Sequence, residues 1–197
     1  MMEPVRVEAD PNGAAAATVR SAADRLGVPI SFPVAGLGPT RIGDVVVPDA
    51  PPRWHVESAL LRATAPKHVL FLCVANSARS QLGEGIGRSL APGDVRISSA
   101  GSAPTSVRPQ AVEVLQEIGI DITGHRSTGL DEVERPVDAV ITLCAEEVCP
   151  VWLEDARRLD WALPDPAGVE GSEEQQLEAF RAVRDELLMR LGVLFGR

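Results

Sequence analysis

The sequence of 197 residues contains no tyrosine, only three cysteines and no long apolar run. No stretch approaches the roughly 18 apolar residues that a membrane-spanning helix needs, and the N-terminus lacks the charged-then-apolar pattern of a secretory signal. We therefore expect a cytoplasmic protein that makes no contact with membranes. An odd number of cysteines in such a protein argues against a structural disulfide framework.

Positive charge is also scarce, because 19 lysines and arginines stand against 28 aspartates and glutamates, which gives a net charge of −9. This negative field repels nucleic acids and acidic membranes, so neither is expected as a partner. An anionic substrate would therefore need a local binding site. The three histidines are scattered, and a lone pair of cysteines does not complete a zinc site, so we expect no metal ion and no cofactor.

From residue 67 onwards the sequence alternates between strand-like and helix-like segments, which is typical of a parallel sheet with helices packed on it. We predict an α/β domain at residues 67–197, with a small, open, mainly parallel four-stranded sheet and helices on both faces. The strands that can be located lie at 68–72, 95–98 and 139–143. The predicted helices lie at about 80–90, from Pro109 to Gly119, and from Ser172 to about Leu191.

Residues 1–66 differ in composition and in their pattern of predicted elements from the rest of the chain. An alanine-rich helix is predicted at 14–26, stopped by Gly27, followed by a short strand at 45–47, a proline-rich linker and a helix at 54–63. Nothing in this segment carries chemistry. We interpret residues 1–66 as an N-terminal extension of unknown role, either a packing appendage or a partly ordered segment.

The chemistry is predicted to centre on the segment after the strand at 68–72. That strand is followed by Cys73, a tight polar loop, and a helix that begins near Arg79 and Ser80. Backbone N–H groups of such a loop and helix start converge on one point, where the helix dipole favours negative charge. Arg79 adds a planar fork suited to a tetrahedral oxyanion, and the same field favours the thiolate form of Cys73.

The predicted oxyanion site consists of Val74, Ala75, Asn76, Ser77, Ala78, Arg79 and Ser80. A thiolate beneath a bound oxyanion is a nucleophile with its substrate in place. The plainer interpretation is a buried cysteine and an unrelated surface arginine. It does not account for the strand before the loop, the hydroxyl beside the arginine or the helix after it.

Two further cysteines follow the predicted strand at 139–143. Ligands of open parallel sheets bind outside the carboxyl ends of the strands, and Cys73 and Cys144 both stand at such ends. Cys149 lies five residues after Cys144, a spacing that permits a disulfide after modest rearrangement. Two half-buried structural thiols are the alternative. A third thiol at the same edge favours a thiol relay, since exchange needs only a thiolate with access to a sulfur atom.

One carboxyl group, Asp165, lies in the proline-flanked loop at residues 163–168. A phosphate-like group attacked by Cys73 needs a proton donor for its leaving oxygen, and a rigidly held carboxyl can serve as the general acid. A turn-forming aspartate before a proline is the alternative interpretation of this residue when it is taken alone.

These motifs together resemble the low-molecular-weight protein tyrosine phosphatase family. The resemblance covers about residues 67–195 and is carried by Cys73-Val-Ala-Asn-Ser-Ala-Arg-Ser80, Ser99-Ala-Gly101, Gly124-His-Arg-Ser127 and Asp165-Pro166. The segments at 81–85, 142–150 and 165–168 are similar to the arsenate reductase branch of that family. Residues 1–66 lie outside the resemblance.

The resemblance implies reduction of arsenate to arsenite for arsenic detoxification. It implies that Cys73 attacks the arsenic atom, that Arg79 and the loop amides hold the arsenate, and that Asp165 protonates the leaving oxygen. Phosphate or sulfate would act as mimics of the substrate. Asn76 and Ser80 match family residues that brace the loop and the thiolate.

The same resemblance implies a relay. Cys144 would attack Cys73 and release arsenite, and Cys149 would resolve the resulting disulfide. The Cys144–Cys149 disulfide would pass to thioredoxin or to a glutaredoxin-type donor. The spacing of these two cysteines is shorter than in the best-known thioredoxin-linked members, which leaves the donor open.

Some family members bind potassium beside the loop. Asn76, Glu84 and Ser99 match that site, but Thr128 stands where its aspartate would be, which argues against a potassium ion here.

Three other functions remain open at this point. A tyrosine phosphatase would use the same Cys73, Arg79 and Asp165, but such relatives usually flank the acid with tyrosines, and this chain has none. A mycothiol- or glutathione-dependent arsenate transferase would need Cys73 alone. A non-catalytic anion sensor, with residues 1–66 binding a partner, is the third.

Overall fold

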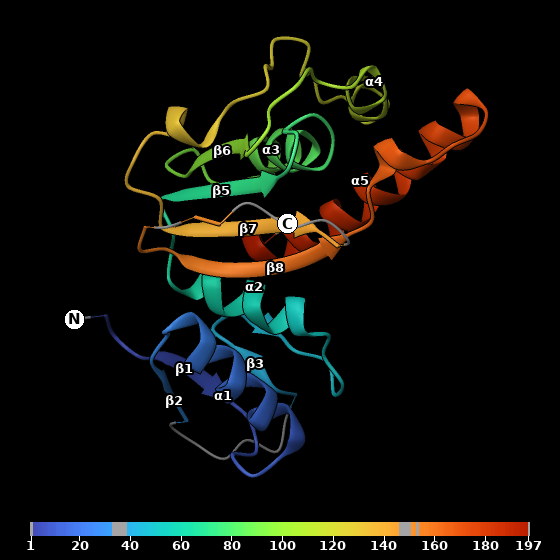
Figure 1. Ribbon diagram of the computed structural model, residues 1–197. Coiled ribbons are helices and arrows are strands. Elements are labelled where there is room, and N and C mark those ends of the chain that lie inside the picture. Colours follow the sequence, from blue (N-terminus) through green and yellow to red (C-terminus); the bar gives the residue numbers. More distant parts are fainter. Residues whose placement is uncertain (1, 33–38, 146–150, 153, 197) are drawn as a thin grey trace. The chain divides into compact units, whose positions relative to one another are not determined.

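The computed structural model of the chain describes residues 2–32, 39–145, 151–152 and 154–196 (Figure 1). The chain divides into two compact units, Met1–Pro66 with Gly192–Arg197, and Lys67–Leu191. Cys149, predicted to resolve the relay, lies outside the described residues. Within the described ranges, none of the helices has the length and apolar character needed to cross a membrane.

The first unit contains a small mixed sheet and two helices. Its elements are β1 (Val5–Glu8), α1 (Ala14–Leu26), β2 (Ile30–Ser31), β3 (Arg41–Ile42), β4 (Val45–Val46) and α2 (Arg53–Ala63). The strand order is β2-β1-β3-β4. Strand β1 runs parallel to β2 and antiparallel to β3, and β3 and β4 form a hairpin. The sequence predicts both helices and the strand at 45–47, but not β1, β2 or β3.

The second unit is built on a four-stranded parallel sheet in the order β6-β5-β7-β8. Its elements are β5 (His68–Cys73), α3 (Arg79–Leu90), β6 (Arg96–Gly101), α4 (Pro109–Gln116), η1 (Leu130–Glu132), β7 (Ala139–Cys144), β8 (Arg157–Leu163), η2 (Pro166–Gly168) and α5 (Glu173–Phe195). The carboxyl ends of the four strands meet at one edge of the sheet (Figure 1). This confirms the predicted α/β fold; β8 is the strand that the sequence did not locate.

Helix α3 covers one face of this sheet. Its glycines permit a close approach, because a Cβ atom at Gly83 or Gly87 would lie 3.0 or 3.2 Å from the ring of Phe71 in β5. The ring centroids of Phe71 and Trp161 of β8 lie 6.3 Å apart. The glycines at these positions thus set how closely α3 sits above β5.

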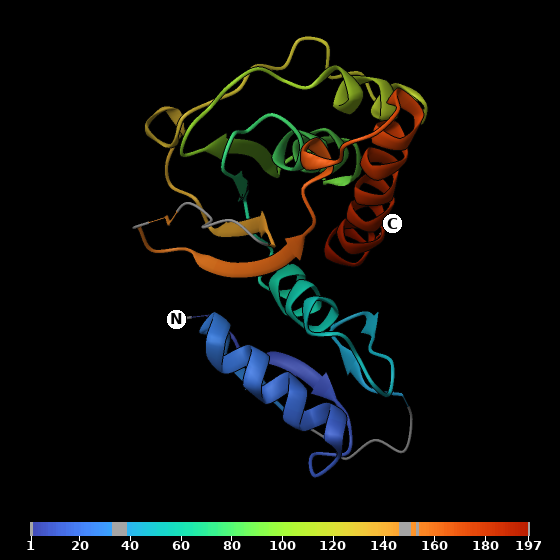
Figure 2. The same ribbon diagram turned by 45° about the vertical axis from the view of Figure 1, so that its right-hand side comes forward.

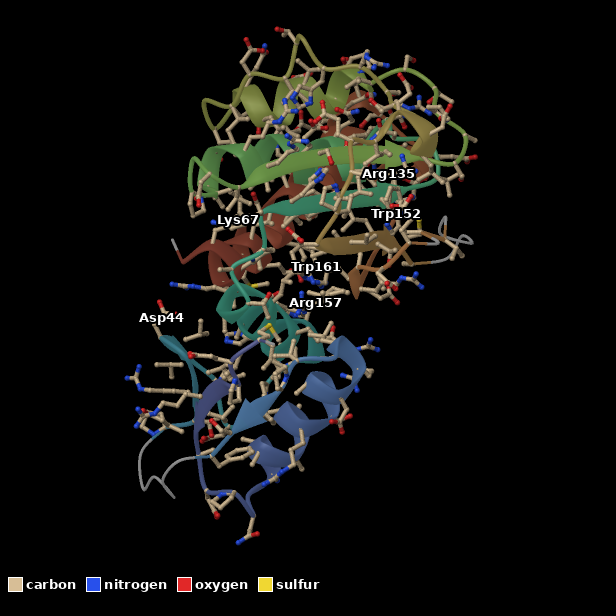
Figure 3. The ribbon with its side chains drawn as sticks, turned by 90° about the vertical axis from the view of Figure 1, so that its left-hand side faces the viewer. Asp44, Lys67, Arg135, Trp152, Arg157 and Trp161 are labelled. Atoms are coloured by element: carbon tan, nitrogen blue, oxygen red, sulfur yellow. The ribbon has the colours of Figure 1, made fainter. Side chains whose placement is uncertain are left out.

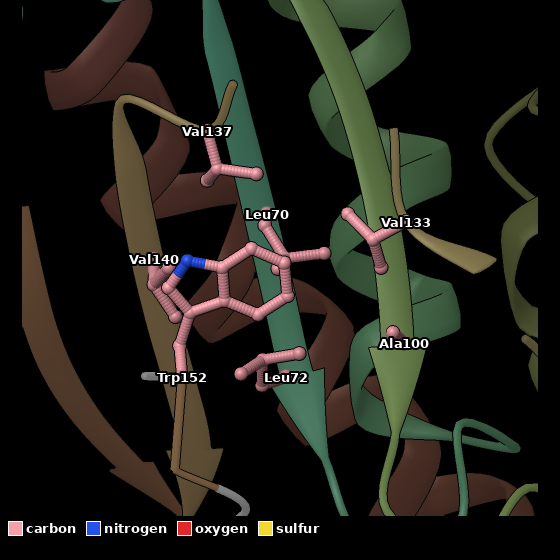
Figure 4. Packing of buried hydrophobic residues seen from close by; sticks show 7 residues of the cluster. All are labelled: Leu70, Leu72, Ala100, Val133, Val137, Val140 and Trp152. Carbon is pink, nitrogen blue, oxygen red and sulfur yellow. The ribbon is translucent and has the colours of Figure 1, made fainter. Parts of the chain in front are cut away.

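The opposite face is covered by the chain around η1 and by Trp152. These side chains form one buried cluster, shown in Figure 4: Leu70, Leu72, Ala100, Val133, Val137, Val140 and Trp152. Leu130 of η1 packs against the cluster. The Arg135 guanidinium lies 5.2 Å from the centre of the Trp152 ring, and Figure 3 labels the two side by side. Helical segments therefore lie on both faces of the sheet, although the one on this face is a single 3₁₀ turn.

Helix α5 begins at a capping box. The Gln175 N–H donates to Ser172 Oγ at 3.3 Å, and the Ser172 N–H donates to Gln175 Oε1 at 2.9 Å. The loop before this helix holds η2 and Asp165, so the cap fixes the end of the segment that carries the predicted general acid.

Candidate active site

Cys73 ends strand β5 in the middle of the sheet. It is a free thiol, buried to 2% exposure, and the loop that follows it leads directly into α3. Its Sγ atom lies 2.9 Å from the Oγ atom of Ser80 in the first turn of α3. The sulfur therefore lies at the carboxyl edge of the sheet, beside the start of a helix, as the sequence predicts.

The loop after Cys73 turns its carbonyl groups outward. Three of them accept backbone N–H groups of the following chain: Val74 from Ala103, Ala75 from Thr105, and Ser77 from Arg108, at 3.0, 3.0 and 2.9 Å. Within the described part of the chain, no N–H group of residues 74–78 donates to another backbone carbonyl. Because carbonyls that face outward leave their neighbouring N–H groups on the inner side, the loop has the form of an anion-binding nest.

Gly101 of β6 lets this loop pack against the sheet edge. A Cβ atom at this position would lie 2.4 Å from the carbonyl oxygen of Val74 and 2.8 Å from the backbone nitrogen of Asn76. The glycine is therefore required by space rather than by conformation. This explains why a glycine ends the strand next to Cys73.

Asn76 is the brace at the centre of the loop. Its φ angle of 44° is left-handed, a conformation that asparagine tolerates better than most residues. Its side-chain nitrogen donates to Ser80 Oγ at 2.8 Å and to Ser99 Oγ at 2.7 Å. Its side-chain oxygen accepts the Thr128 N–H at 2.7 Å and Gln81 Nε2 at 3.0 Å. All four hydrogen-bonding positions of this buried amide are thus filled.

These donations orient two hydroxyl groups. Because Asn76 donates to both oxygens, the hydrogen of Ser99 points to Glu84 Oε2 at 2.5 Å. The hydrogen of Ser80 is then available to the Cys73 sulfur. A hydroxyl that donates to sulfur stabilises the thiolate. The family resemblance relates Asn76, Ser99 and Glu84 to a potassium site. Here Asn76 donates to Ser99 and Ser99 donates to Glu84, so the three side chains form a hydrogen-bonded series.

A second layer that the sequence did not single out as site residues holds Asn76. Gln81 Nε2 donates to the Asn76 carbonyl oxygen at 3.1 Å, and Ser127 Oγ donates to the same oxygen at 2.6 Å. His125 Nδ1 lies 2.9 Å from Gln81 Oε1, and Arg88 Nη1 lies 3.3 Å from His125 Nε2. Since Gln81 uses its nitrogen as donor to Asn76, its oxygen must accept from His125. Three of these four contacts join residues 37 to 51 positions apart, so local patterns do not reveal them.

Arg79 is buried at the start of α3 and faces the loop after β8. Its Nη1 donates to the Leu163 carbonyl oxygen at 3.1 Å, and its Nη2 lies 3.6 Å from Asp165 Oδ1. Asp165 also accepts the Ala167 N–H at 3.3 Å, and its side chain is 39% exposed. The structure thus brings the predicted arginine and the predicted acid together. An oxyanion in the loop would compete with Asp165 for the guanidinium group.

Cys144 ends β7, the strand paired with β5, so the two cysteines stand at the ends of adjacent strands. Cys144 is 6% exposed and is disulfide-bonded, whereas Cys73 is a free thiol. The predicted site residues from Cys73 to Ser80, together with Asp165 and Cys144, therefore come from one edge of the sheet.

Ala162, the next-to-last residue of β8, has a strained backbone conformation. Its φ of 44° is left-handed, and it lies where the pairing of β7 with β8 shifts register, one residue before the carbonyl that Arg79 binds. We expect Ala162→Gly to raise the free energy of unfolding by about 0.5–1 kcal/mol, because glycine adopts this conformation without a Cβ clash. Ala162→Val should lower it by about 1–3 kcal/mol. Urea unfolding of both variants tests this, and a destabilised glycine variant would contradict it.

One buried histidine, His68, and one half-buried histidine, His125, make the stability depend on pH. Burial lowers the pKa of His68, and burial with the nearby Arg88 charge lowers the pKa of His125, both from the ordinary value of 6.5. Below that value the unfolded chain binds protons that the folded chain does not. This contribution is therefore fully present above pH 6.5 and is lost as the pH falls towards the folded pKa values.

We therefore expect the free energy of unfolding to fall between about pH 7 and pH 5, by up to about 1.4 kcal/mol per pH unit for each histidine. The double variant His68→Gln/His125→Gln should show a flatter slope over this range, whatever its absolute stability. Urea unfolding at each pH measures both. Equal slopes in the variant and the parent would show that other groups cause the dependence.

A thiol beneath an anion-binding loop, at the carboxyl edge of a parallel sheet, defines the site of a cysteine-dependent phosphatase fold. The family model described as low molecular weight phosphotyrosine protein phosphatase matches residues 68–197. The chain belongs to this family.

Among its relatives, this chain is 41% identical to the arsenate reductase of Halalkalibacterium halodurans and 37% identical to that of Bacillus subtilis. Each match spans 128 residues, which is 64% of this chain and 92% of the relative. Among solved structures, an arsenate reductase in the oxidized state matches with a TM-score of 0.56 and 34% sequence identity. An arsenate reductase in the phosphate binding state matches with a TM-score of 0.55 and 36% sequence identity. Each covers 66% of this chain and 97% of the other.

Proposed function

We propose that this chain reduces arsenate to arsenite, for arsenic detoxification, and that residues 67–197 carry the whole activity while residues 1–66 form an extension. One observation carries the proposal: Cys73 and Cys144 end the adjacent strands β5 and β7. A phosphatase needs one thiolate, whereas a reductase of this kind needs a second thiol that reaches the first. Relatives named arsenate reductase support the same assignment.

The oxyanion loop would bind arsenate as a tetrahedral anion. The N–H groups of residues 74–78 and the guanidinium of Arg79 would hold its oxygens above the Cys73 sulfur, and phosphate or sulfate would compete for the same place. The local positive field is needed because the chain as a whole carries a net charge of −9. Shape and charge alike then favour small tetrahedral oxyanions over larger anions.

The first chemical step joins sulfur to arsenic. The Cys73 thiolate, held by the Ser80 hydroxyl at 2.9 Å, attacks the arsenic atom, and one arsenate oxygen leaves as water after it takes a proton from Asp165. Asp165 is suited to this role because it lies 3.6 Å from Arg79, the residue that would hold the arsenate. The product is a covalent arsenic–sulfur bond at Cys73, still at the As(V) oxidation level.

The second step transfers two electrons to arsenic. The thiolate of Cys144 attacks the Cys73 sulfur, the sulfur–arsenic bond breaks, and its electron pair leaves with arsenic as arsenite. A Cys73–Cys144 disulfide remains. The thiolate of Cys149 then attacks Cys144, frees Cys73 and leaves a Cys144–Cys149 disulfide.

An external dithiol must reduce this last disulfide before the next turnover. Thioredoxin or a glutaredoxin-type protein has the chemistry required, since each supplies two electrons and two protons through a thiol pair. A relay that depends on such donors suits a reducing compartment, which supports a cytoplasmic location.

The test measures arsenite released from arsenate by the full chain. Reduced enzyme alone should release close to one arsenite per chain, and added thioredoxin with its reductase and NADPH, or glutaredoxin with glutathione, should give repeated turnover. Cys73→Ser should release none in either case. Hydrolysis of an aryl phosphate without any arsenite release would instead identify a phosphatase.

A transferase that uses a small thiol would give a third pattern. The Cys144→Ser/Cys149→Ser variant would then release arsenite repeatedly with mycothiol or glutathione at the parent rate, because that mechanism needs Cys73 alone. The same variant should make no repeated turnover with either protein donor if the relay operates.

A further inference from the structure

The first unit has a strand order and a set of strand directions that define a known scaffold. β1, α1 and β2 form a unit of two parallel strands joined by a helix, and the β3–β4 hairpin with α2 follows it. The order is β2-β1-β3-β4. Because β3 is antiparallel to both β1 and β4, it runs against the other three strands. This arrangement is that of the thioredoxin fold.

The helices agree with that assignment. Helix α1 lies along β1 in both views (Figures 1 and 2), and α1 and α2 pack against each other. The contact includes an ion pair, in which Arg25 of α1 lies 3.2 Å from the buried carboxylate of Glu57 in α2. The helix after the first strand and the helix after the hairpin therefore lie together, as the two halves of a thioredoxin fold require.

In proteins of this fold, thiol–disulfide exchange takes place at the start of the helix that follows the first strand, on two cysteines separated by two residues. The corresponding helix here is α1, whose N-cap is Gly13. Ala16 lies three positions further on and is completely buried, whereas Gly13 is partly exposed. One accessible and one shielded position is the arrangement that an attacking and a resolving thiol need. The chain has no cysteine before Cys73.

We propose that the first unit carries a thiol–disulfide exchange site of thioredoxin type from which only the sulfur atoms are missing, with Gly13 and Ala16 at the two cysteine positions. The unit therefore keeps the scaffold of a reductase but contributes no electrons. Reduction of the Cys144 disulfide must then come from a separate donor molecule. This inference concerns the first unit alone and does not depend on arsenate chemistry.

The experiment restores the two thiols in the full chain. Gly13→Cys/Ala16→Cys is made in a Cys73→Ser/Cys144→Ser/Cys149→Ser background, so that the new pair provides the only thiols. Space permits the first change, because a Cβ atom at Gly13 would meet its nearest neighbour, the Asp10 carbonyl oxygen, at 3.3 Å, and its φ of −74° is ordinary. The matched control is Ser21→Cys/Asp24→Cys, with the same spacing on the exposed last turns of the same helix.

The assay follows reduction of the insulin disulfides by dithiothreitol. The restored dithiol would give two electrons and two protons to an insulin disulfide, close to a disulfide of its own, and be reduced again by dithiothreitol. We expect at least a tenfold faster reaction with the Gly13/Ala16 pair than with the control pair. The thiol introduced at Gly13 alone should also react with iodoacetamide at lower pH than the one introduced at Ser21 alone.

Equal rates for the two pairs, with both variants folded by circular dichroism, would overturn the proposal. If the double variant does not fold, the single Gly13→Cys variant decides by its reactivity, since its site lies at the partly exposed N-cap. A negative insulin assay would not change the interpretation of the arsenite assay. A negative arsenite assay would likewise not change the conclusion about the first unit.

Discussion

Replacement of Arg79 by lysine is expected to lower kcat/KM for arsenate by roughly 10²-fold or more, the loss typical of removing one preorganised oxyanion donor. Arg79 is buried and already spans two partners, the Leu163 carbonyl oxygen at 3.1 Å and Asp165 at 3.6 Å. A guanidinium can keep the first contact while it presents a second N–H to the substrate. A lysine ammonium is a compact point charge without the planar fork, so it cannot bind the Leu163 carbonyl and the substrate in the same geometry.

The control for this variant is Arg96→Lys. Arg96 begins β6, at the opposite end of the strand from Gly101, and pairs with Glu134 on an exposed surface. Exchanging it should leave turnover unchanged, since an exposed ion pair contributes little. Steady-state arsenite release, together with urea unfolding of each variant, separates lost chemistry from lost stability. An Arg79→Lys enzyme within threefold of the parent would rule out the proposed role.

The oxyanion loop could be predicted because all of its parts are contiguous. A buried strand, a cysteine at its end, a polar loop and a helix start follow one another within about 15 residues, and local geometry then fixes where the N–H groups point. Sequence reasoning succeeds where the relevant contacts are local.

The rest of the site depends on contacts between distant segments. The contacts from His125 through Gln81 to Asn76 join positions 44 and 5 residues apart. His125 and Gln81 lie in segments that carry the family resemblance, but no local pattern shows that they contact each other. The left-handed φ of Ala162 is also invisible in sequence, because alanine rarely adopts it. The conformation of Ala162 coincides with the register shift between β7 and β8 rather than with any local sequence pattern.

Strand β8 and the strands β1, β2 and β3 of the first unit were missed for a simpler reason. Buried and exposed positions alternate along β8, but its exposed positions include Arg158 and Asp160, so the segment lacks a continuous apolar run. Strands β2 and β3 contain only two residues each. Strands this short, or with charges at alternate positions, lack the continuous apolar run by which β5 and β7 were located. The arrangement of residues 1–66 therefore follows only from the strand order.

Substitution of Cys149 by serine is expected to limit the enzyme to one arsenite per chain. Without Cys149 nothing resolves the Cys73–Cys144 disulfide within the chain, so the first turnover should finish and the second should not begin. Rapid quenching followed by mass spectrometry of peptides should identify that disulfide as the trapped species. Continued turnover by this variant, with a protein donor at the parent rate, would contradict the relay and favour a mechanism that needs Cys73 alone.

Substitution of Cys144 by serine is expected to stop the reaction one step earlier, before any arsenite leaves. Cys144 ends the strand next to that of Cys73, so it is the thiol placed to attack the sulfur–arsenic bond, and its loss should leave arsenic bound to Cys73. Intact-protein mass spectrometry should detect that adduct, and an added small thiol should release arsenite from it. Both variants should retain whatever aryl phosphatase activity the parent shows, because the loop, Arg79 and Asp165 are unchanged. Arsenite release at the parent level in a single turnover of Cys144→Ser would show that another group reduces the arsenic.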